Sequence, residues 1–598
     1  MKSFVKVTSR PCSRVQLVVF LSICAVFAPI THSKCHAQSV EKRREERNKQ
    51  LIDLMIAALS HKDENRRAGA ANMLGRSTYI RATAKATPAL KQAMINDSSE
   101  LVRVLCAKAY WLLTGDNYDA VPLLMKGLQS KSDTIRGQAT RAFIKVGTDG
   151  KRAIPLLKNL VHDKNVRIRE AAIKALESKG RWAKIAVPDL VKALEDEEYK
   201  NSNEARNSDY AAMALAEIGV ASKEVEQGLV KALDSKDAPT QVQSALTLAT
   251  LKLKPAKLVP LLLKLVNCDD EYQASLAVKA LGVFVLEDKR VYPVIENFVL
   301  DYLTDNENAN LHAFFEAKTA LVKSGAKAKG CYLEVSKILS NAKVDEEGKF
   351  PRTVETAIEL IRDAGPHGKA AWPDLTRFVK AKAPHLSLTA AHAIWKLKGD
   401  QSELLRVMPK ILNSKLAYLY FNVETIIEEM GPQAKALLPH IRTWGKDPEA
   451  VRAVVWLLGK LKANDKESLK ICRNALRVGK PGTQFLAAES LWAITKESKE
   501  ALAVLKPLLK HPNKATQFGA VLVIAKLGEA GRIVQPQLLK YLRGSVLRRQ
   551  LASCRALSQI QFRNDKVLKA LGKASEDRDP EVAEAAKKAI DKLQKSSK

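Results

Sequence analysis

Apolar residues recur at spacings of three and four along most of the chain, in paired runs separated by a short polar stretch. Residues 154–180 (IPLLKNLVHDKNVRIREAAIKALESKG) show the pattern: the first run begins beside Pro155, and the second ends at Gly180. Such spacings place apolar side chains on one face of an α-helix. Proline is tolerated in a first turn, and glycine is typical of a helix end. The pattern therefore predicts pairs of amphipathic helices joined by polar loops.

The same pattern repeats along the chain. A shift of 33 residues places residues 121–147 over residues 154–180, with Arg136 on Arg169. About fifteen or sixteen units of about 30 to 41 residues follow one another between Leu51 and the C-terminus. A period in this range is typical of a solenoid, in which each helix pair buries its apolar face against its neighbours. The sequence therefore predicts an all-α superhelix of two-helix repeats.

A polar motif, D-x(5)-R-x-x-A, marks the loop and the start of the second helix. Its Asp and Arg stand as Asp97 with Arg103 and as Asp163 with Arg169. Units with this motif resemble HEAT repeats, of the short bacterial kind also grouped with the phycobilin-lyase-type HEAT-like repeats, over roughly residues 51–595. The resemblance implies a HEAT-like α-solenoid in which these Asp and Arg side chains form a ladder between stacked loops and helix starts.

The implied ladder gives its arginines a structural role. We expect Arg169 to brace the stack with Asp163. The ladder is expected to be interrupted, because Ser130 replaces the aspartate before Arg136 and later units keep the motif more weakly. Arg167 has no counterpart in the preceding unit and is predicted to add to the basic surface. The predicted structural ladder comprises Asp97, Arg103, Arg136, Asp163 and Arg169.

The first 37 residues read as an export signal. Basic residues from Lys2 to Arg14 precede an apolar run at 15–30, and a polar stretch then ends at the small residue Ala37. This arrangement predicts a cleaved signal peptide over 1–37, a charged N-terminal segment over 38–50 and the solenoid over 51–598. An uncleaved anchor is the alternative, although the run is shorter than the ~20 residues of a membrane span. We therefore expect an exported, periplasmic or secreted protein.

Charge is unevenly distributed along the chain. Lys and Arg number 98 against 65 Asp and Glu, a formal net charge of +33. Residues 501–573 alone hold fourteen Lys or Arg and two acids. Inserted loops at 195–209, 301–312 and 341–352 are either binding elements or tolerated insertions. The densest basic stretch, 540–555, is the candidate contact with an anionic partner through Lys540, Arg543, Arg548, Arg549 and Arg555.

No catalytic, metal-binding or cofactor-binding residue is predicted. The sequence lacks H-E-x-x-H, G-x-S-x-G and P-loop motifs, and His385 and His392, seven residues apart, are interpreted as surface histidines. Trp111, Trp395 and Trp492 share one repeat position, which indicates packing. The cysteines beyond the signal are interpreted as buried apolar residues, with pairing to a partner through one exposed thiol as the alternative: Cys106, Cys268, Cys331, Cys472 and Cys554.

These patterns favour an exported, non-enzymatic scaffold whose curved surface binds a protein or an acidic polymer of the envelope. One alternative is a nucleic-acid-binding protein similar to HEAT-like DNA glycosylases, against which the export signal and the absence of a recognisable base-accepting site both argue. Another is a HEAT-like lyase, which rests on the repeat alone. The sequence does not indicate an oligomeric state.

Overall fold

The computed structural model describes residues 34–75, 83–114, 119–196, 207–304, 309–344, 350–413, 420–511, 514–544, 547–560, 564–577 and 579–595. The predicted signal at 1–37 therefore lies almost entirely outside the described residues. So do large parts of the inserted loops at 195–209, 301–312 and 341–352. Within the described residues there is no β-strand, and no helix is long and apolar enough to cross a membrane.

Sixteen helix pairs follow one another in the described part of the chain, which confirms the predicted all-α solenoid. Seven short 3-10 helices connect some of the elements: η2 (Thr83–Ala86), η3 (Gly147–Ala153), η4 (Gly180–Ala186), η5 (Gly325–Ala328), η6 (Gly365–Ala371), η8 (Gly431–Leu437) and η9 (Gly528–Val534).

The first helices of the pairs are α2 (Lys34–Ala58), α4 (Thr87–Asn96), α6 (Ala120–Gly127), α8 (Ile154–Leu160), α10 (Val187–Ala193), α12 (Lys223–Ala232), α14 (Leu258–Leu265), α16 (Val291–Thr304), α18 (Lys329–Asn341), α20 (Trp372–Val379), α22 (Ser402–Asn413), α24 (Leu438–Trp444), α26 (Lys466–Val478), α28 (Lys499–Leu508), α30 (Gln535–Leu542) and α32 (Asp565–Ala574).

The second helices are α3 (Glu64–Leu74), α5 (Glu100–Thr114), α7 (Asp133–Val146), α9 (Val166–Glu177), α11 (Asn207–Ile218), α13 (Ala238–Thr250), α15 (Glu271–Leu281), α17 (Leu311–Ser324), α19 (Arg352–Ala364), α21 (Pro384–Lys398), α23 (Tyr420–Met430), α25 (Val451–Lys460), α27 (Pro481–Thr495), α29 (Lys514–Ala525), α31 (Leu547–Ile560) and α33 (Pro580–Lys595).

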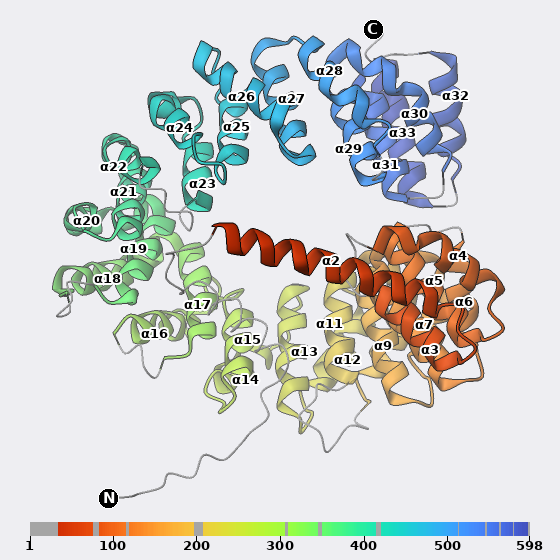
Figure 1. The fold of residues 1–598 in the computed structure, drawn as a ribbon. Coiled ribbons are helices and arrows are strands. Elements are labelled where there is room, and N and C mark those ends of the chain that lie inside the picture. Colours follow the sequence, from red (N-terminus) through yellow and green to blue (C-terminus); the bar gives the residue numbers. More distant parts are fainter. Residues whose placement is uncertain are drawn as a thin grey trace, which may run out of the picture.

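The pairs stack side by side into a curved superhelix. Second helices pack on second helices of neighbouring pairs, as α5 does on α7 and α7 on α9. Figure 1 shows second helices such as α13, α15 and α17 along the inner side of the arc and first helices such as α16, α18 and α20 along its outer side. The buried apolar residues form one continuous core along the stack, as expected of units that cannot bury their apolar faces alone.

Small residues let the second helices approach one another. Ala139, Ala142, Ala172 and Ala175 are almost fully buried where α7 packs on α9. Gly180 follows this contact with a positive φ of 53°, a conformation that glycine adopts at little cost. In the unit at 154–180 the proline and glycine signals therefore mark the ends of elements, whereas Pro409 and Pro507 lie inside α22 and α28.

The N-terminal boundary differs from a simple linker. Helix α2 runs without interruption from Lys34 to Ala58, so the predicted charged segment at 38–50 and the start of the solenoid at Leu51 lie on one helix. The predicted cleavage after Ala37 falls in the first turn of α2. The described residues leave the predicted cleavage untested.

The two ends of the superhelix meet. Figure 1 shows α33 and its neighbours beside the helices of the N-terminal quarter. Lys151 of η3 lies 2.9 Å from Glu581 of α33 and 3.8 Å from Asp579 (Nζ to carboxylate oxygen), and its ammonium lies 3.9 Å from the ring centre of Trp182. The loop edge of the last pair therefore rests on the connections that follow α7 and α9.

Candidate binding interface

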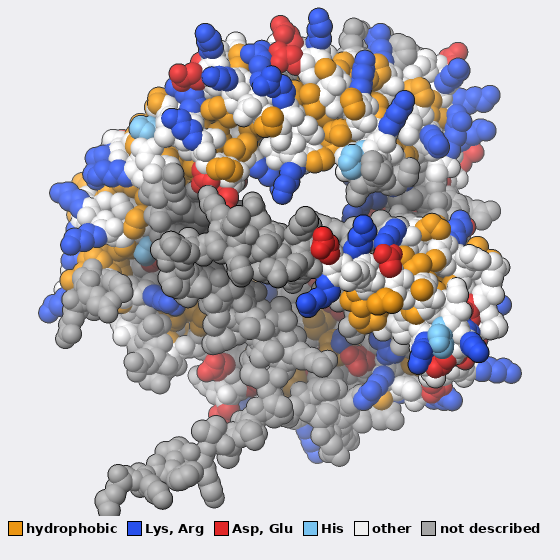
Figure 2. Space-filling view, in the orientation of Figure 1, with side chains coloured by type: hydrophobic (Ala, Val, Ile, Leu, Met, Phe, Trp, Pro, Cys, Tyr) orange, Lys and Arg blue, Asp and Glu red, His pale blue; other side chains and the backbone are white. Residues whose placement is uncertain are grey.

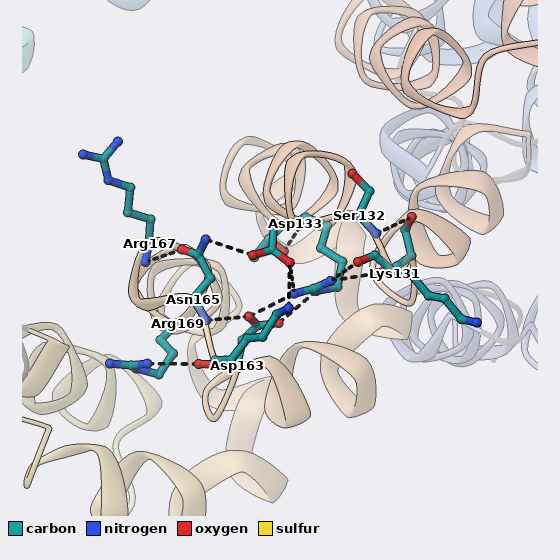
Figure 3. A network of polar contacts seen from close by, with 11 residues as sticks. Lys131, Ser132, Asp133, Asp163, Asn165, Arg167 and Arg169 are labelled. Carbon is teal, nitrogen blue, oxygen red and sulfur yellow. Dashed lines mark hydrogen bonds and ion pairs between the residues drawn. The ribbon is translucent and has the colours of Figure 1, made fainter.

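The loops that join the two helices of each pair line one edge of the solenoid, and a recurring contact there links the N-terminal pairs. Arg136 donates from Nε and Nη2 to both carboxylate oxygens of Asp163, at 2.9 and 3.1 Å. Arg169 makes the same two-bond contact with Asp196, at 2.7 and 3.2 Å. Arg67 does so with Asp97, at 2.8 and 3.0 Å. These bidentate contacts form a ladder from one helix pair to the next. Figure 3 shows the part of the ladder around Asp163.

The pairing within the ladder differs from the sequence expectation. Arg169 donates from Nη1 to the backbone carbonyl of Asp163 at 3.0 Å, whereas the carboxylate of Asp163 accepts the bidentate contact from Arg136 of the preceding pair. Each of these three arginines is the fourth residue of a second helix. Its side chain donates both to a carbonyl of its own loop and to the aspartate of the next loop. The carboxylate partner of Arg169 is Asp196, which the motif did not single out.

The ladder is interrupted at Arg103. Its Nη1 donates to the carbonyls of Asp97 and Ser98, at 2.6 and 3.0 Å. The next loop offers Ser130 in place of an aspartate, and the Ser130 hydroxyl donates to Glu100 at 3.3 Å instead. In the described contacts, Arg103 therefore donates to the carbonyls of its own loop, as the other ladder arginines do, but makes no bidentate contact with a carboxylate of the next loop.

Glutamines occupy the arginine position near the C-terminus. Gln484, Gln517 and Gln550 follow one another at intervals of 33 residues, and each donates its amide to a carbonyl at or just beyond the end of the first helix of its own pair. Gln550 also donates to Asp577 of the next loop at 3.4 Å, the same sequence offset of 27 residues that joins Arg136 to Asp163. The sequence reasoning missed this substitution, although the 33-residue interval could have revealed it.

The candidate anionic contact lies at the same edge, around the loop between α30 and α31. Lys540, Arg543 and Arg548 are exposed, as is Arg555 farther along α31. Arg549 is half-buried, and its guanidinium lies 5.4 Å from the ring centre of Tyr541 and 5.8 Å from that of Phe518. Within the described part of the chain, no ion pair neutralises these five cations, so they contribute uncompensated positive charge.

Arg167 lies apart from the ladder. Its side chain is exposed, and its backbone N–H donates to the Asn165 side chain at 3.0 Å, a helix-capping contact. Figure 3 shows the guanidinium pointing away from Asp133 and Asp163. The two arginines at 167 and 169 thus face different surroundings.

Charges on the inner second helices are largely paired across neighbouring pairs. Lys396 and His392 of α21 contact Glu429 of α23 at 2.8 and 3.0 Å, and Lys526 of α29 contacts Glu489 of α27 at 2.8 Å. Lys318 of α17 likewise lies 3.0 Å from Asp363 of α19. The inner face therefore neutralises much of its own charge.

His392 corrects one interpretation from the sequence. It is only 6% exposed and stacks on Trp395, with ring centres 5.7 Å apart, so it is a buried residue of α21 and not a surface histidine. Burial lowers the pKa of His392, and the positive charges of Arg362 and Lys396 act in the same direction, against the opposing contact with Glu429. The periodicity of α21 could not reveal this, because the glutamate comes from the next pair.

The five cysteines beyond the predicted signal lie in the described part of the chain, as do other side chains of the metal-ligating kinds. No group of three or more His, Cys, Asp or Glu side chains there could hold a metal ion. Burial raises the pKa values of Cys106, Cys331, Cys472 and Cys554 to about 12, which keeps these thiols protonated. Cys268 is partly exposed and its pKa is also raised by burial.

A cavity of about 730 Å³ lies where the ends of the superhelix meet. Trp182, Tyr210 and Glu581 contribute to its walls. Both aromatic rings make cation–π contacts with lysines of the same chain. Lys151 lies over Trp182, and the ammonium of Lys174 lies 3.8 Å from the ring centre of Tyr210. Glu581 of α33 is among the lining residues, so the last helix pair borders the cavity.

The family model described as HEAT repeats matches residues 87–177 and 121–208. No curated protein matches the chain. The similar solved structures include yeast importin-beta (Kap95p), 11% identical over 92% of this chain and 84% of that chain, with a TM-score of 0.48. They also include Kap121p, 12% identical over 98% of this chain and 79% of that chain, with a TM-score of 0.41. Similarities at this level of sequence identity and TM-score do not identify a partner or an activity for this chain. The matched repeats within residues 87–208 and the sixteen described helix pairs together show a HEAT-like α-solenoid fold.

Proposed function

We propose that the chain is an exported, non-enzymatic scaffold that binds an anionic partner at its loop edge. The observation that carries the proposal is the cluster of cations around the loop between α30 and α31. Exposed ion pairs contribute little to folding stability, and these cations have no described carboxylate partner, so the fold gives little reason for their concentration. A protein or polymer that supplies negative charge would account for it.

The test is binding of a labelled poly-glutamate probe to the purified chain at low salt and at about 0.5 M salt. Screening at the higher salt shortens the reach of exposed charges to a few Å, so binding should weaken steeply. Arg548→Gln with Arg549→Gln should weaken it at low salt. The matched control, Lys192→Gln with Lys264→Gln, removes the same charge from exposed lysines elsewhere. Salt-independent binding, or equal loss in both double variants, would contradict the proposal.

A nucleic acid is the competing partner. Titration of the chain with duplex and single-stranded DNA at the same salt concentrations separates the two, since the proposal expects no preference for DNA over poly-glutamate of equal charge. A strong DNA preference that survives moderate salt would favour the nucleic-acid alternative.

Export is the other half of the proposal and rests on the predicted signal at 1–37. Expression in a bacterial host followed by cell fractionation should place the protein outside the cytoplasm, with Gln38 as its first residue by N-terminal sequencing. Recovery in the membrane fraction with residues 1–37 retained would favour the uncleaved anchor.

A further inference from the structure

Three consecutive loops differ in charge from their N-terminal counterparts. We call residues 477–484, 510–517 and 543–550 the glutamine loops, because each ends at one of the three ladder glutamines. They contain no Asp or Glu. The equivalent loops that end at the ladder arginines, 96–103, 129–136 and 162–169, each contain at least one. The loop between the two helices of a pair thus contains both acidic and basic residues in these N-terminal pairs, but only basic charged residues in the three C-terminal pairs.

The substitution of glutamine for arginine is part of this difference. Arg136 needs the carboxylate of Asp163 because both side chains are nearly buried, 11% and 6% exposed. Gln517 donates to the loop carbonyl of His511 at 2.7 Å, and Gln484 donates to the carbonyl of Leu476 at the end of α26 at 3.0 Å, without bringing a charge that needs neutralising. The glutamine loops therefore hold together without acids, and their surface cations are left uncompensated.

The cations of the glutamine loops face solvent. Within the described part of the chain none of the exposed ones forms an ion pair: Arg477, Lys480, Lys510, Arg543 and Arg548. Figure 2 shows Lys and Arg side chains spaced along the upper arc, over the C-terminal pairs. Because neighbouring helices pack about 8–10 Å apart, three consecutive loops span about 20 Å. The surface is therefore an elongated basic strip, not a single pocket.

An exposed apolar side chain interrupts the strip. Val478 follows Arg477 directly and is 73% exposed, the most exposed of the large hydrophobic residues in the described part of the chain. A uniformly charged polymer has no group to cover it, whereas a polypeptide can present acids and an apolar side chain together. An extended peptide rises about 3.3 Å per residue, so about six residues cover the strip.

We infer that the glutamine loops bind an extended acidic polypeptide segment that carries an apolar side chain for Val478. The inference rests on the proposed function and names the partner class for the same edge. It extends the contact from the loop between α30 and α31 to the two preceding loops.

The test measures fluorescence anisotropy of a labelled peptide of about twelve residues with alternate glutamates and one central leucine. Three variants of the strip are measured: the double variant Arg477→Gln with Lys480→Gln, the single variant Lys510→Gln and the single variant Arg543→Gln. The control is the double variant Lys192→Gln with Lys264→Gln. Each cation removed from the strip should weaken binding about twofold to fivefold, and the control should change it little. Val478→Ser should weaken binding of this peptide and leave a peptide with serine in place of leucine unaffected.

The outcomes separate the inference from the proposed function. Loss confined to Arg548→Gln with Arg549→Gln would overturn the strip and leave the proposed function standing. If polyphosphate and the leucine peptide bind equally well and Val478→Ser changes neither affinity, the inferred polypeptide partner is wrong and a charged polymer is favoured. Failure of every anionic probe to bind the unaltered chain would overturn both.

Discussion

Arg136 shows how one side chain can join three segments of a repeat protein. It donates to the loop carbonyls of Ser130 and Lys131, to Asp133 at the start of its own helix and to Asp163 of the next loop. An arginine suits this place because its planar guanidinium offers five donors in a fixed geometry. The hydrogen bonds to Asp163 and Asp133 raise the pKa of Arg136, although burial opposes this, so the side chain stays charged.

Removal of one ladder carboxylate should destabilise the N-terminal pairs. Asp163→Ala leaves Arg136 nearly buried without its main counter-charge, and the expected loss is about 3 kcal/mol in the free energy of unfolding. Urea titration followed by circular dichroism measures the loss, and hydrogen exchange should place it in α7 to α9. Asp133→Ala is the control, because Asp133 is 38% exposed and should cost less than about 1 kcal/mol. Equal losses in the two variants would contradict the role of the ladder.

The interruption at Arg103 gives the reciprocal prediction. Ser130→Asp places a carboxylate 27 residues after Arg103, the offset at which Asp163 follows Arg136. The new pair should stabilise the chain by about 1 kcal/mol in the same urea titration. The gain should vanish in a variant that combines Ser130→Asp with Arg103→Gln, and a gain that persists there would show another cause.

His392 should make stability depend on pH. Burial lowers its pKa below the ordinary value of about 6.5, so the unfolded chain binds a proton there before the folded chain does. Stability should therefore fall as the pH drops below about 6.5, toward the lower pKa of the folded state. Urea titrations at pH 7 and pH 5 should show a smaller decrease for His392→Gln than for the unaltered chain. An identical decrease would assign the pH dependence to other groups.

At the scale of elements, the apolar spacing was sufficient to predict the helix pairs. The unit at 154–180 resolves into α8 and α9, with Pro155 in the first turn of α8 as expected. Local pattern predicts such features because a helix and its ends depend on neighbouring residues. The number of pairs, sixteen in the described part of the chain, also agrees with the repeat count.

Contacts between pairs were harder to predict, for a physical reason. Asp163 is six residues from Arg169 in sequence, yet its carboxylate contacts Arg136, because stacking brings a loop against the helix start of the preceding pair. The burial of His392 likewise depends on α23. The fold class followed from periodicity, whereas site geometry required knowledge of how consecutive pairs stack.

At the scale of the whole molecule, curvature brings the last pair onto the N-terminal quarter. Pairs adjacent in sequence share a continuous apolar core, but the end-to-end contact is carried by charge around Lys151. The Lys151 side chain is only 9% exposed between Glu581 and Trp182. Breaking such a nearly buried pair costs more than breaking an exposed ion pair, because the remaining charge is left without its partner. The closed shape therefore depends on few residues.

Lys151→Glu should open the superhelix while leaving its helices intact. The variant places a glutamate against Glu581 and Asp579, so the ends repel each other, and the radius of gyration from small-angle X-ray scattering should increase. Helix content by circular dichroism should stay unchanged, because the pairs are stabilised by their neighbours in sequence. Combination with Glu581→Lys restores opposite charges and should return the radius toward its original value. An unchanged radius in Lys151→Glu would show that the stacking of consecutive pairs, and not the end-to-end contact, sets the closed shape.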